Sequence, residues 1–300
     1  MDISMKYSEN LGKSRLQDQI NKPKVGLPRR ESIQELERLI GLTEVKKNLA
    51  EVIAFSMIQN KRSEAHLKAC STSLHMIFKG NPGTGKTTVA RILGKIFKDL
   101  EILSKGHLVE AERADLVGEY IGHTAQKTKE IIKKSLGGVL FIDEAYSLAQ
   151  GGEKDFGQEA ISALVKAMED SRENLIVILA GYPGEMERFL RSNPGLRSRF
   201  PIHIDFPDYD AEDLFQIALQ MYEERDYELS SRCRWRLKQN LNEFANGRHP
   251  YSGNARYVRN LVEKSIRLQA LRIVDFERHS RKSLVTIEDI DLPDPSEIKN

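Results

Sequence analysis

The sequence predicts an α/β protein in which a five-stranded parallel sheet is flanked by helices and followed by a small all-helical domain. Two observations support this fold class. Short apolar runs, typical of buried strands, alternate with helical spacings of apolar residues through the middle of the chain. Strands that alternate with helices form parallel sheets. Beyond Phe206-Pro207-Asp208 only helical spacings remain. The predicted strands are residues 75–79, 107–111, 138–143, 175–180 and 201–206.

The remaining elements follow in chain order. Residues 1–31 are polar and basic and are interrupted by prolines, so we expect a flexible N-terminal segment. A helix is predicted from Ser32, Gly41 interrupts the pattern, and a second helix follows. Helices of the sheet region are expected at 86–98, 124–134, 157–169 and 184–191, and those of the last domain at 210–224, 231–245 and 253–275. The predicted division is therefore residues 1–31, an α/β domain of residues 32–208 and a helical domain of residues 209–300.

The most specific motif lies between the first predicted strand and the helix after it. It reads Gly80-Asn81-Pro82-Gly83-Thr84-Gly85-Lys86-Thr87 and fits the P-loop pattern at every fixed position. The glycines let backbone N–H groups turn toward phosphate oxygens. Lys86 offers a charge to the β- and γ-phosphates, Thr87 offers a hydroxyl to Mg²⁺, and the helix that continues through Thr88 presents its positive end to the anion. A glycine-rich turn with an unrelated lysine is the alternative, which the flanking strand and helix disfavour.

An acidic pair follows the third predicted strand. In open α/β sheets, ligands bind at the carboxyl ends of the strands, so Asp143 and Glu144 are expected beside the P-loop. Asp143 would help to hold Mg²⁺, and Glu144 would activate the attacking water as a general base. The alternative is an acidic strand end that meets solvent. Together the two motifs predict hydrolysis of a nucleoside triphosphate.

Composition excludes several other classes. The 300 residues carry a net charge of +2, so no general polyanion-binding signature is present. Residues 1–30 and 256–282 are locally basic, and we interpret both as solvated surface. No apolar run is long enough to span a membrane, and the N-terminus lacks an apolar signal core, so we expect a cytoplasmic protein. The two cysteines and scattered histidines lack the spacing of a metal site.

With these motifs in place, the chain resembles the AAA+ ATPases over about residues 32–292. It is most similar to the clade that contains the red-type rubisco activase CbbX and stage V sporulation protein K, and it leans toward the sporulation branch. The motifs that carry the resemblance are residues 140–148, residues 178–182 and residues 192–200. The resemblance implies ATP and Mg²⁺ as cofactors, and a role in bacterial sporulation.

The resemblance also implies roles for single residues. Ile40 and Gly41 would lie in the segment that reads the adenine edge, although a simple helix–helix turn is the alternative. Arg199 would be the arginine finger that reaches a neighbouring subunit's γ-phosphate, and Arg197 could brace the interface or replace it. Both could instead be ion-pairing surface arginines. Each finger acts between subunits and so implies a ring.

Two further positions follow from the resemblance. Gly253-Asn254-Ala255-Arg256 is similar to the sensor-2 motif, in which Arg256 reaches over the phosphates, with Arg259 as the substitute on the same helix face. Many AAA+ proteins place an asparagine after the fourth strand, where this chain has Tyr182. The tyrosine hydroxyl could orient water in its place.

The segment after the second predicted strand resembles the pore loop of protein-remodelling rings. Tyr120 and Ile121 could grip a polypeptide, and Gly122 would let the loop bend. Alternatively, Tyr120 packs on the core. We therefore predict an ATP-driven homo-oligomer, expected to be a hexameric ring, that remodels or threads an unidentified protein substrate. The other candidates are a nucleic-acid motor, which the absence of basic–aromatic interleaving disfavours, and a nucleotide-switched scaffold.

Overall fold

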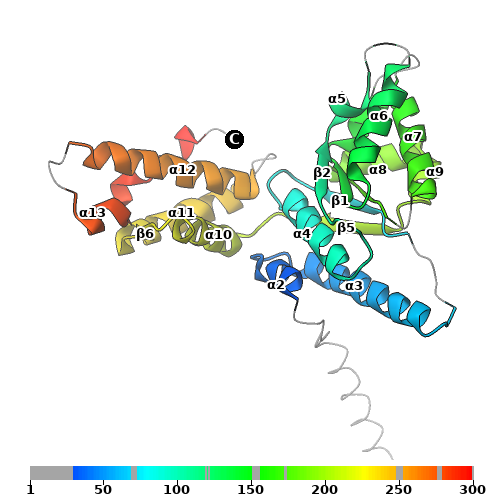
Figure 1. Ribbon diagram of the computed structural model, residues 1–300. Helices are drawn as coiled ribbons and strands as arrows, with labels where there is room; N and C mark the ends of the chain where they lie inside the picture. The colour runs from blue at the N-terminus through cyan, green and yellow to red at the C-terminus, as the bar shows by residue number, and fades with distance from the viewer. Residues whose placement is uncertain are drawn as a thin grey trace, which may run out of the picture.

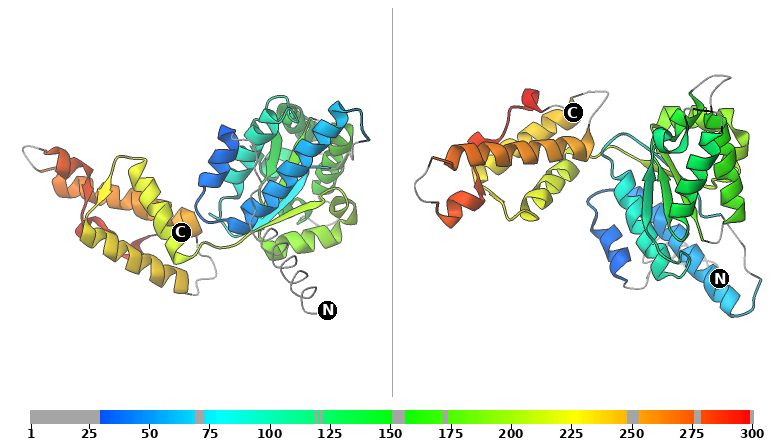
Figure 2. Two further views of the ribbon diagram at one scale, coloured as in Figure 1. Left: turned by 90° about the horizontal axis from the view of Figure 1, so that it is seen from below. Right: turned by 45° about the horizontal axis from the view of Figure 1, so that its top comes forward.

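The computed structural model describes residues 30–68, 73–118, 120, 122–150, 156–171, 174–247, 253–275 and 279–298. Two lobes are visible in Figure 1: an α/β core, and a helical domain that a short extended segment joins to it. Both views in Figure 2 show the same two lobes from other directions. The core contains five parallel strands, as predicted, and their order in the sheet is β2-β3-β4-β1-β5. Their bounds are β1 Met76–Gly80, β2 Leu108–Ala111, β3 Val139–Ile142, β4 Ile176–Gly181 and β5 Ile202–Phe206.

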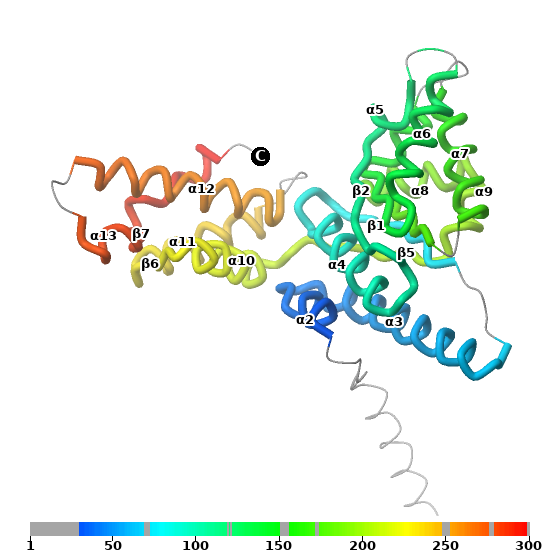
Figure 3. Tube along the Cα trace, in the orientation of Figure 1, coloured from blue at the N-terminus to red at the C-terminus, as the bar shows by residue number. Residues whose placement is uncertain are grey.

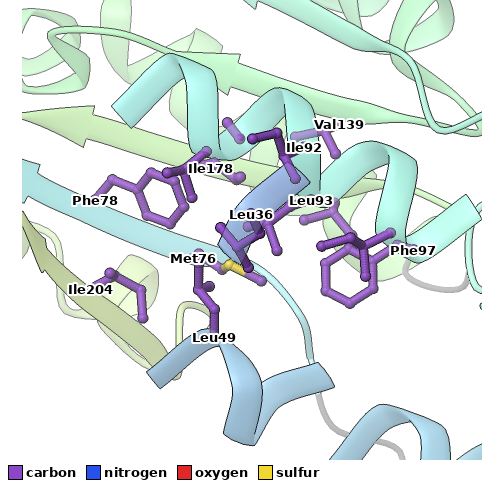
Figure 4. Packing of buried hydrophobic residues seen from close by; sticks show 14 of the residues in the cluster. Leu36, Leu49, Met76, Phe78, Ile92, Leu93, Phe97, Val139, Ile178 and Ile204 are labelled. Atoms are coloured by element: carbon purple, nitrogen blue, oxygen red, sulfur yellow. The ribbon is translucent and has the colours of Figure 1, made fainter. Parts of the chain in front are cut away.

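Successive residues of a strand point to opposite faces of the sheet and therefore pack against different helices. Met76 and Phe78 of β1 pack into one apolar cluster, whereas Ile77 between them packs into the other. This alternation is the period of two that a pleated strand imposes. Figure 4 shows the first cluster, in which Leu36 and Leu49 meet the sheet beside α4. The helices on this face are α2 Glu31–Arg38, α3 Thr43–Glu64 and α4 Lys86–Asp99.

The opposite face is covered by the elements that follow β2, β3 and β4. They are α5 Arg113–Leu116, α6 His123–Ser135, the 3₁₀ turn η1 Ala145–Ala149, α7 Gly157–Asp170, α8 Pro183–Ser192 and α9 Pro194–Arg197. The long predicted helices are present within a few residues. The single turns α5, η1 and α9 were not predicted, since four or five residues give no measurable periodicity.

The helical domain has its own apolar core. Its helices are α10 Ala211–Glu223, α11 Ser231–Asn246, α12 Asn254–Ile273 and α13 Arg281–Val285, with 3₁₀ turns η2 Asp289–Asp291 and η3 Pro295–Glu297. A parallel pair of two-residue strands, β6 Glu228–Leu229 and β7 Thr286–Ile287, departs from the helices-only prediction. The tube in Figure 3 shows α12 running along the domain from the lobe junction. None of the helices within the described ranges is long and apolar enough to cross a membrane.

Candidate nucleotide-binding site

A cleft of about 390 Å³ lies where the P-loop, the ends of β3 and β4, and the first turns of α12 meet. Most of the predicted site residues line it. They are Gly80, Pro82, Gly83, Gly85, Lys86, Thr87, Thr88, Asp143, Glu144, Tyr182 and Arg256. The topology explains this convergence, because β1, β3 and β4 are neighbouring parallel strands whose carboxyl ends meet at one edge of the sheet.

The P-loop has the backbone that its glycines allow. Gly83 and Gly85 have φ values of +74° and +92°, in the left-handed region that glycine adopts without strain. The Lys86 ammonium donates hydrogen bonds of 2.8 Å to the backbone carbonyls of Gly80 and Asn81. Burial lowers the pKa of Lys86, with repulsion from Arg256 acting in the same direction and attraction to Asp143 opposing it. A partly buried ammonium group whose two hydrogen bonds go to neutral carbonyls gains free energy when a phosphate binds.

Two predicted P-loop residues shape the loop and do not line the cleft. The Asn81 amide donates to both carboxylate oxygens of Asp208 at 3.0 Å, which ties the loop to the segment after β5. Thr84 is fully buried, and its hydroxyl donates to the Asn81 carbonyl at 2.8 Å. These bonds hold the curl that turns the loop around the lysine.

The acidic pair lies at the end of β3. Asp143 donates its N–H to the Ala111 carbonyl at 3.1 Å, so the β2–β3 ladder positions it. Glu144 adopts φ +46°, and its N–H donates to Asp143 Oδ1 at 2.9 Å. A left-handed conformation costs a non-glycine residue about 1–2 kcal/mol. Such strain is typical of functional positions, where the surrounding structure imposes it.

Two aromatic rings pack beside the acidic pair. The Tyr146 and Tyr182 rings lie 6.3 Å apart, and Tyr146 packs so closely on Gly181 that a Cβ there would lie 2.8 Å from the ring. Burial first, and then the charge of Glu144, raise the pKa of Tyr146 to about 12. Tyr146 therefore stays a neutral hydroxyl. Sequence reasoning did not single it out, although its place two residues after Glu144 was the available signal.

Two additional cations line the cleft. Arg91 follows Thr87 by one helical turn of α4 and donates to Glu110 Oε1 at 2.7 Å. The sequence analysis missed it, although its i,i+4 spacing from Thr87 placed it on the same helix face. Arg259, the substitute for Arg256, also lines the cleft. With Lys86, the wall carries four cations against two carboxylates, which suits a polyphosphate.

Ile40 and Gly41 lie outside the cleft wall. Gly41, at φ +61°, approaches Asp213 of α10 so closely that a Cβ would lie 2.4 Å from its carboxylate. Close by, the Tyr209 hydroxyl donates to the Thr84 carbonyl at 3.4 Å, and burial raises the pKa of Tyr209 to about 12. The segment before α3 therefore contacts the helical domain next to the P-loop. Its adenine-reading role stays a prediction.

The two candidate finger residues do not line the cleft of their own chain. The Arg199 guanidinium donates to Glu169 on α7 and to the Gly195 carbonyl. Arg197, at the end of α9, is exposed and has no ion-pair partner within the described residues. The structure thus gives the two arginines different surroundings: Arg199 is partly exposed and pairs with Glu169 of its own chain, whereas Arg197 is exposed to solvent.

The predicted pore loop is described in part. Tyr120 is 66% exposed, and its ring makes an edge contact with His123 at 5.5 Å. Gly122 has φ +83° with open space around it. Ile121 lies outside the described residues. The exposure of Tyr120 argues against the alternative in which its ring packs on the core.

Comparisons with known proteins agree with this geometry. Residues 76–208 match the model of the ATPase family associated with various cellular activities (AAA), and residues 210–300 match an AAA lid domain. Stage V sporulation protein K of Bacillus subtilis (strain 168) is 57% identical, over 86% of this chain and 81% of that protein. Protein CbbX of Cereibacter sphaeroides is 46% identical, over 81% of this chain and 79% of that protein.

Solved structures show the same fold. The AAA domain of FIGL-1 in complex with ADP superposes with a TM-score of 0.58 at 19% identity, over 85% of this chain and 80% of that one. A mutant of Thermotoga maritima RuvB gives a TM-score of 0.52 at 21% identity, over 83% of this chain and 70% of that one. At these identities the likeness concerns the fold alone.

Proposed function

The chain belongs to the AAA family of ATPases, in the group of stage V sporulation protein K and CbbX, and we propose that it works as a ring motor that remodels or threads a protein substrate. The ATPase activity follows from the family. The residues that carry it, the ring and the substrate belong to the proposal.

In the proposed site, the P-loop and Lys86 bind the phosphates, and Glu144 polarises the attacking water. Thr87 and Asp143 both lie on the wall of this cleft and could ligate a metal through side-chain oxygens, which are the ligands that Mg²⁺ prefers. The described residues contain no group of three or more His, Cys, Asp or Glu side chains that could hold a metal without further ligands. The nucleotide's phosphates and water would therefore complete the shell, and the ion would neutralise phosphate charge.

Arginines of a neighbouring subunit would complete the site. The pairing of Arg199 with Glu169 is partly exposed, and such pairs contribute about 1 kcal/mol or less. Arg199 can therefore leave it for a γ-phosphate, and Arg197 needs no such exchange. A finger from either position supports a homo-oligomeric ring, for which we propose six subunits on the family resemblance.

One observation carries the choice of a polypeptide substrate: the 66% exposure of Tyr120 in the loop between α5 and α6. An exposed aromatic ring can hold a chain by apolar contact without reading its sequence. The basic surface of α12 offers less to a nucleic acid, because Arg272 pairs with Asp291 and Lys264 pairs with Glu297. The 57% sequence identity with stage V sporulation protein K supports a role in sporulation, and we propose that this role is cytoplasmic.

The test is ATP turnover of the wild type and of Tyr120→Ala, with a permanently unfolded polypeptide or single-stranded DNA added. We expect the polypeptide to raise wild-type turnover several-fold, and Tyr120→Ala to keep basal turnover but lose this response. Tyr120→Phe is the matched control, since it keeps the ring, and should retain the response. Stimulation by DNA alone would overturn the proposal in favour of a nucleic-acid motor.

A further inference from the structure

The first turn of α12 is docked on the tip of the P-loop. Asn254 is buried to 1% exposure and adopts φ +45°. Its amide Nδ2 donates to the Pro82 carbonyl at 3.3 Å, and the next backbone N–H, of Ala255, donates to the Gly83 carbonyl at 3.1 Å. The packing is tight, because a Cβ at Gly83 would lie 2.2 Å from the Gly253 carbonyl.

These two bonds fix the orientation of two peptide planes. In a trans peptide the carbonyl of one residue and the N–H of the next point in opposite directions, and the described chain has no cis bonds. When the Pro82 and Gly83 carbonyls face α12, the N–H groups of Gly83 and Thr84 therefore face away from it. That is the orientation a phosphate-binding loop requires, because its N–H groups must be left for the anion.

The same amide also fixes α12 to the segment between the lobes. Asn254 Nδ2 donates to Asp208 Oδ1 at 2.8 Å, and Asn254 Oδ1 accepts from the Tyr209 N–H at 3.0 Å. Asp208 accepts from Asn81 of the P-loop as well. Position 254 thus needs a donor, an acceptor and a side chain that tolerates the left-handed backbone, and asparagine combines all three.

We propose that Asn254 is a positioning residue that orients the P-loop peptides for phosphate binding and makes that orientation depend on the position of the helical domain. Asn254 is not part of the cleft wall, whereas its neighbours Ala255 and Arg256 are. It acts through Pro82 and not on the nucleotide. A movement of α12 that draws Asn254 away releases the Pro82 and Gly83 carbonyls together. This inference rests on the P-loop cleft being the ATP site.

The readout is the ratio of the affinities for ADP and AMP, measured by calorimetry on the full chain. The P-loop N–H groups bind the phosphates of the nucleotide. If these groups lose their orientation, the affinity for ADP should fall more than the affinity for AMP, which has one phosphate fewer. Asn254→Gly keeps the backbone conformation and removes the amide. Asn254→Asp keeps the shape of the side chain but removes the Nδ2 donor and places a carboxylate next to that of Asp208. We expect each to reduce the ratio about tenfold, as the loss of one or two hydrogen bonds would.

A double variant separates positioning from plain stability. In Asn254→Asp with Asp208→Asn, the amide introduced at position 208 donates to the carboxylate at 254, so the link between the lobes returns, but Pro82 still lacks its donor. We expect the melting temperature to recover and the ADP-to-AMP ratio to stay below that of Asp208→Asn alone, which is the control for the acceptor that Asn81 loses at position 208.

Two outcomes overturn the proposal. A ratio that recovers together with the melting temperature would mean that Asn254 stabilises the junction only. An unchanged ratio in the single variants would exclude any action on the P-loop. A wild-type chain without preference for ADP over AMP would instead reject the ATP site itself, and the inference with it.

Discussion

Protonation of His75 should destabilise the fold below neutral pH. The ring precedes β1, is 3% exposed, and its Nδ1 accepts the Val177 N–H at 3.0 Å, so a proton on that nitrogen would break the bond. Burial lowers the pKa of His75 to about 4, opposed by a backbone hydrogen bond to Met168. The unfolded chain keeps the ordinary pKa of 6.5. Between these values the unfolded state binds the extra proton, so stability falls as pH falls below about 6.5.

The two pKa values set the size of the effect. The full difference corresponds to about 3 kcal/mol below pH 4, of which about 2 kcal/mol is lost by about pH 5. His75→Asn offers Val177 an amide oxygen as acceptor and does not titrate. Urea unfolding gives the free energy of unfolding of both proteins from pH 8 to pH 5. The difference between them isolates the contribution of His75, because every other titrating group contributes equally to the pH dependence of both proteins. A stability difference that stays constant within about 0.5 kcal/mol over this range would refute the reasoning.

Three further predictions concern the cleft and the subunit contact. Glu144→Gln should lower ATP turnover at least about a hundredfold and keep ATP binding; near-normal turnover would remove Glu144 from the general-base role. Arg197→Ala and Arg199→Ala should differ, with the finger variant losing about a thousandfold in turnover and recovering when mixed with subunits that lack the P-loop lysine. If neither variant recovers on mixing, the finger does not act between subunits. Gly83→Ala should lower the melting temperature and ADP affinity, because its Cβ meets backbone on α12, whereas Gly184→Ala has open space and should change neither; equal effects would contradict the tight docking.

The fold was predictable where an element is long enough to carry a period. The run from Gly138 to Asp143 predicted a buried central strand, and β3 spans Val139–Ile142 with every residue buried. The pair β6–β7 escaped prediction because each strand has two residues, and its pairing joins segments more than fifty residues apart. Such a pairing depends on how α11 and α12 pack, which no local pattern records.

The site residues that belong to short sequence motifs were predictable. Lys86 and Asp143 belong to local patterns whose strand context brings them together, and the cleft contains both. Arg91 was missed because it belongs to no named motif, although its i,i+4 spacing from Thr87 places both residues on the same face of α4. The pairing of Arg199 with Glu169 was also invisible, since the two residues lie on separate elements.

The contact between Asn254 and Pro82 links the conformation of the P-loop to the position of the helical domain. A P-loop that held its N–H groups inward by its own bonds would bind phosphate regardless of the second domain. Here two carbonyls at its tip are taken by α12, from which Arg256 also enters the cleft. One rigid helix thus carries both a phosphate-facing charge and the groups that orient the loop. A rotation of the helical domain would therefore change both at once. In the proposed ring, contacts that move this domain would alter phosphate binding without a separate signalling element.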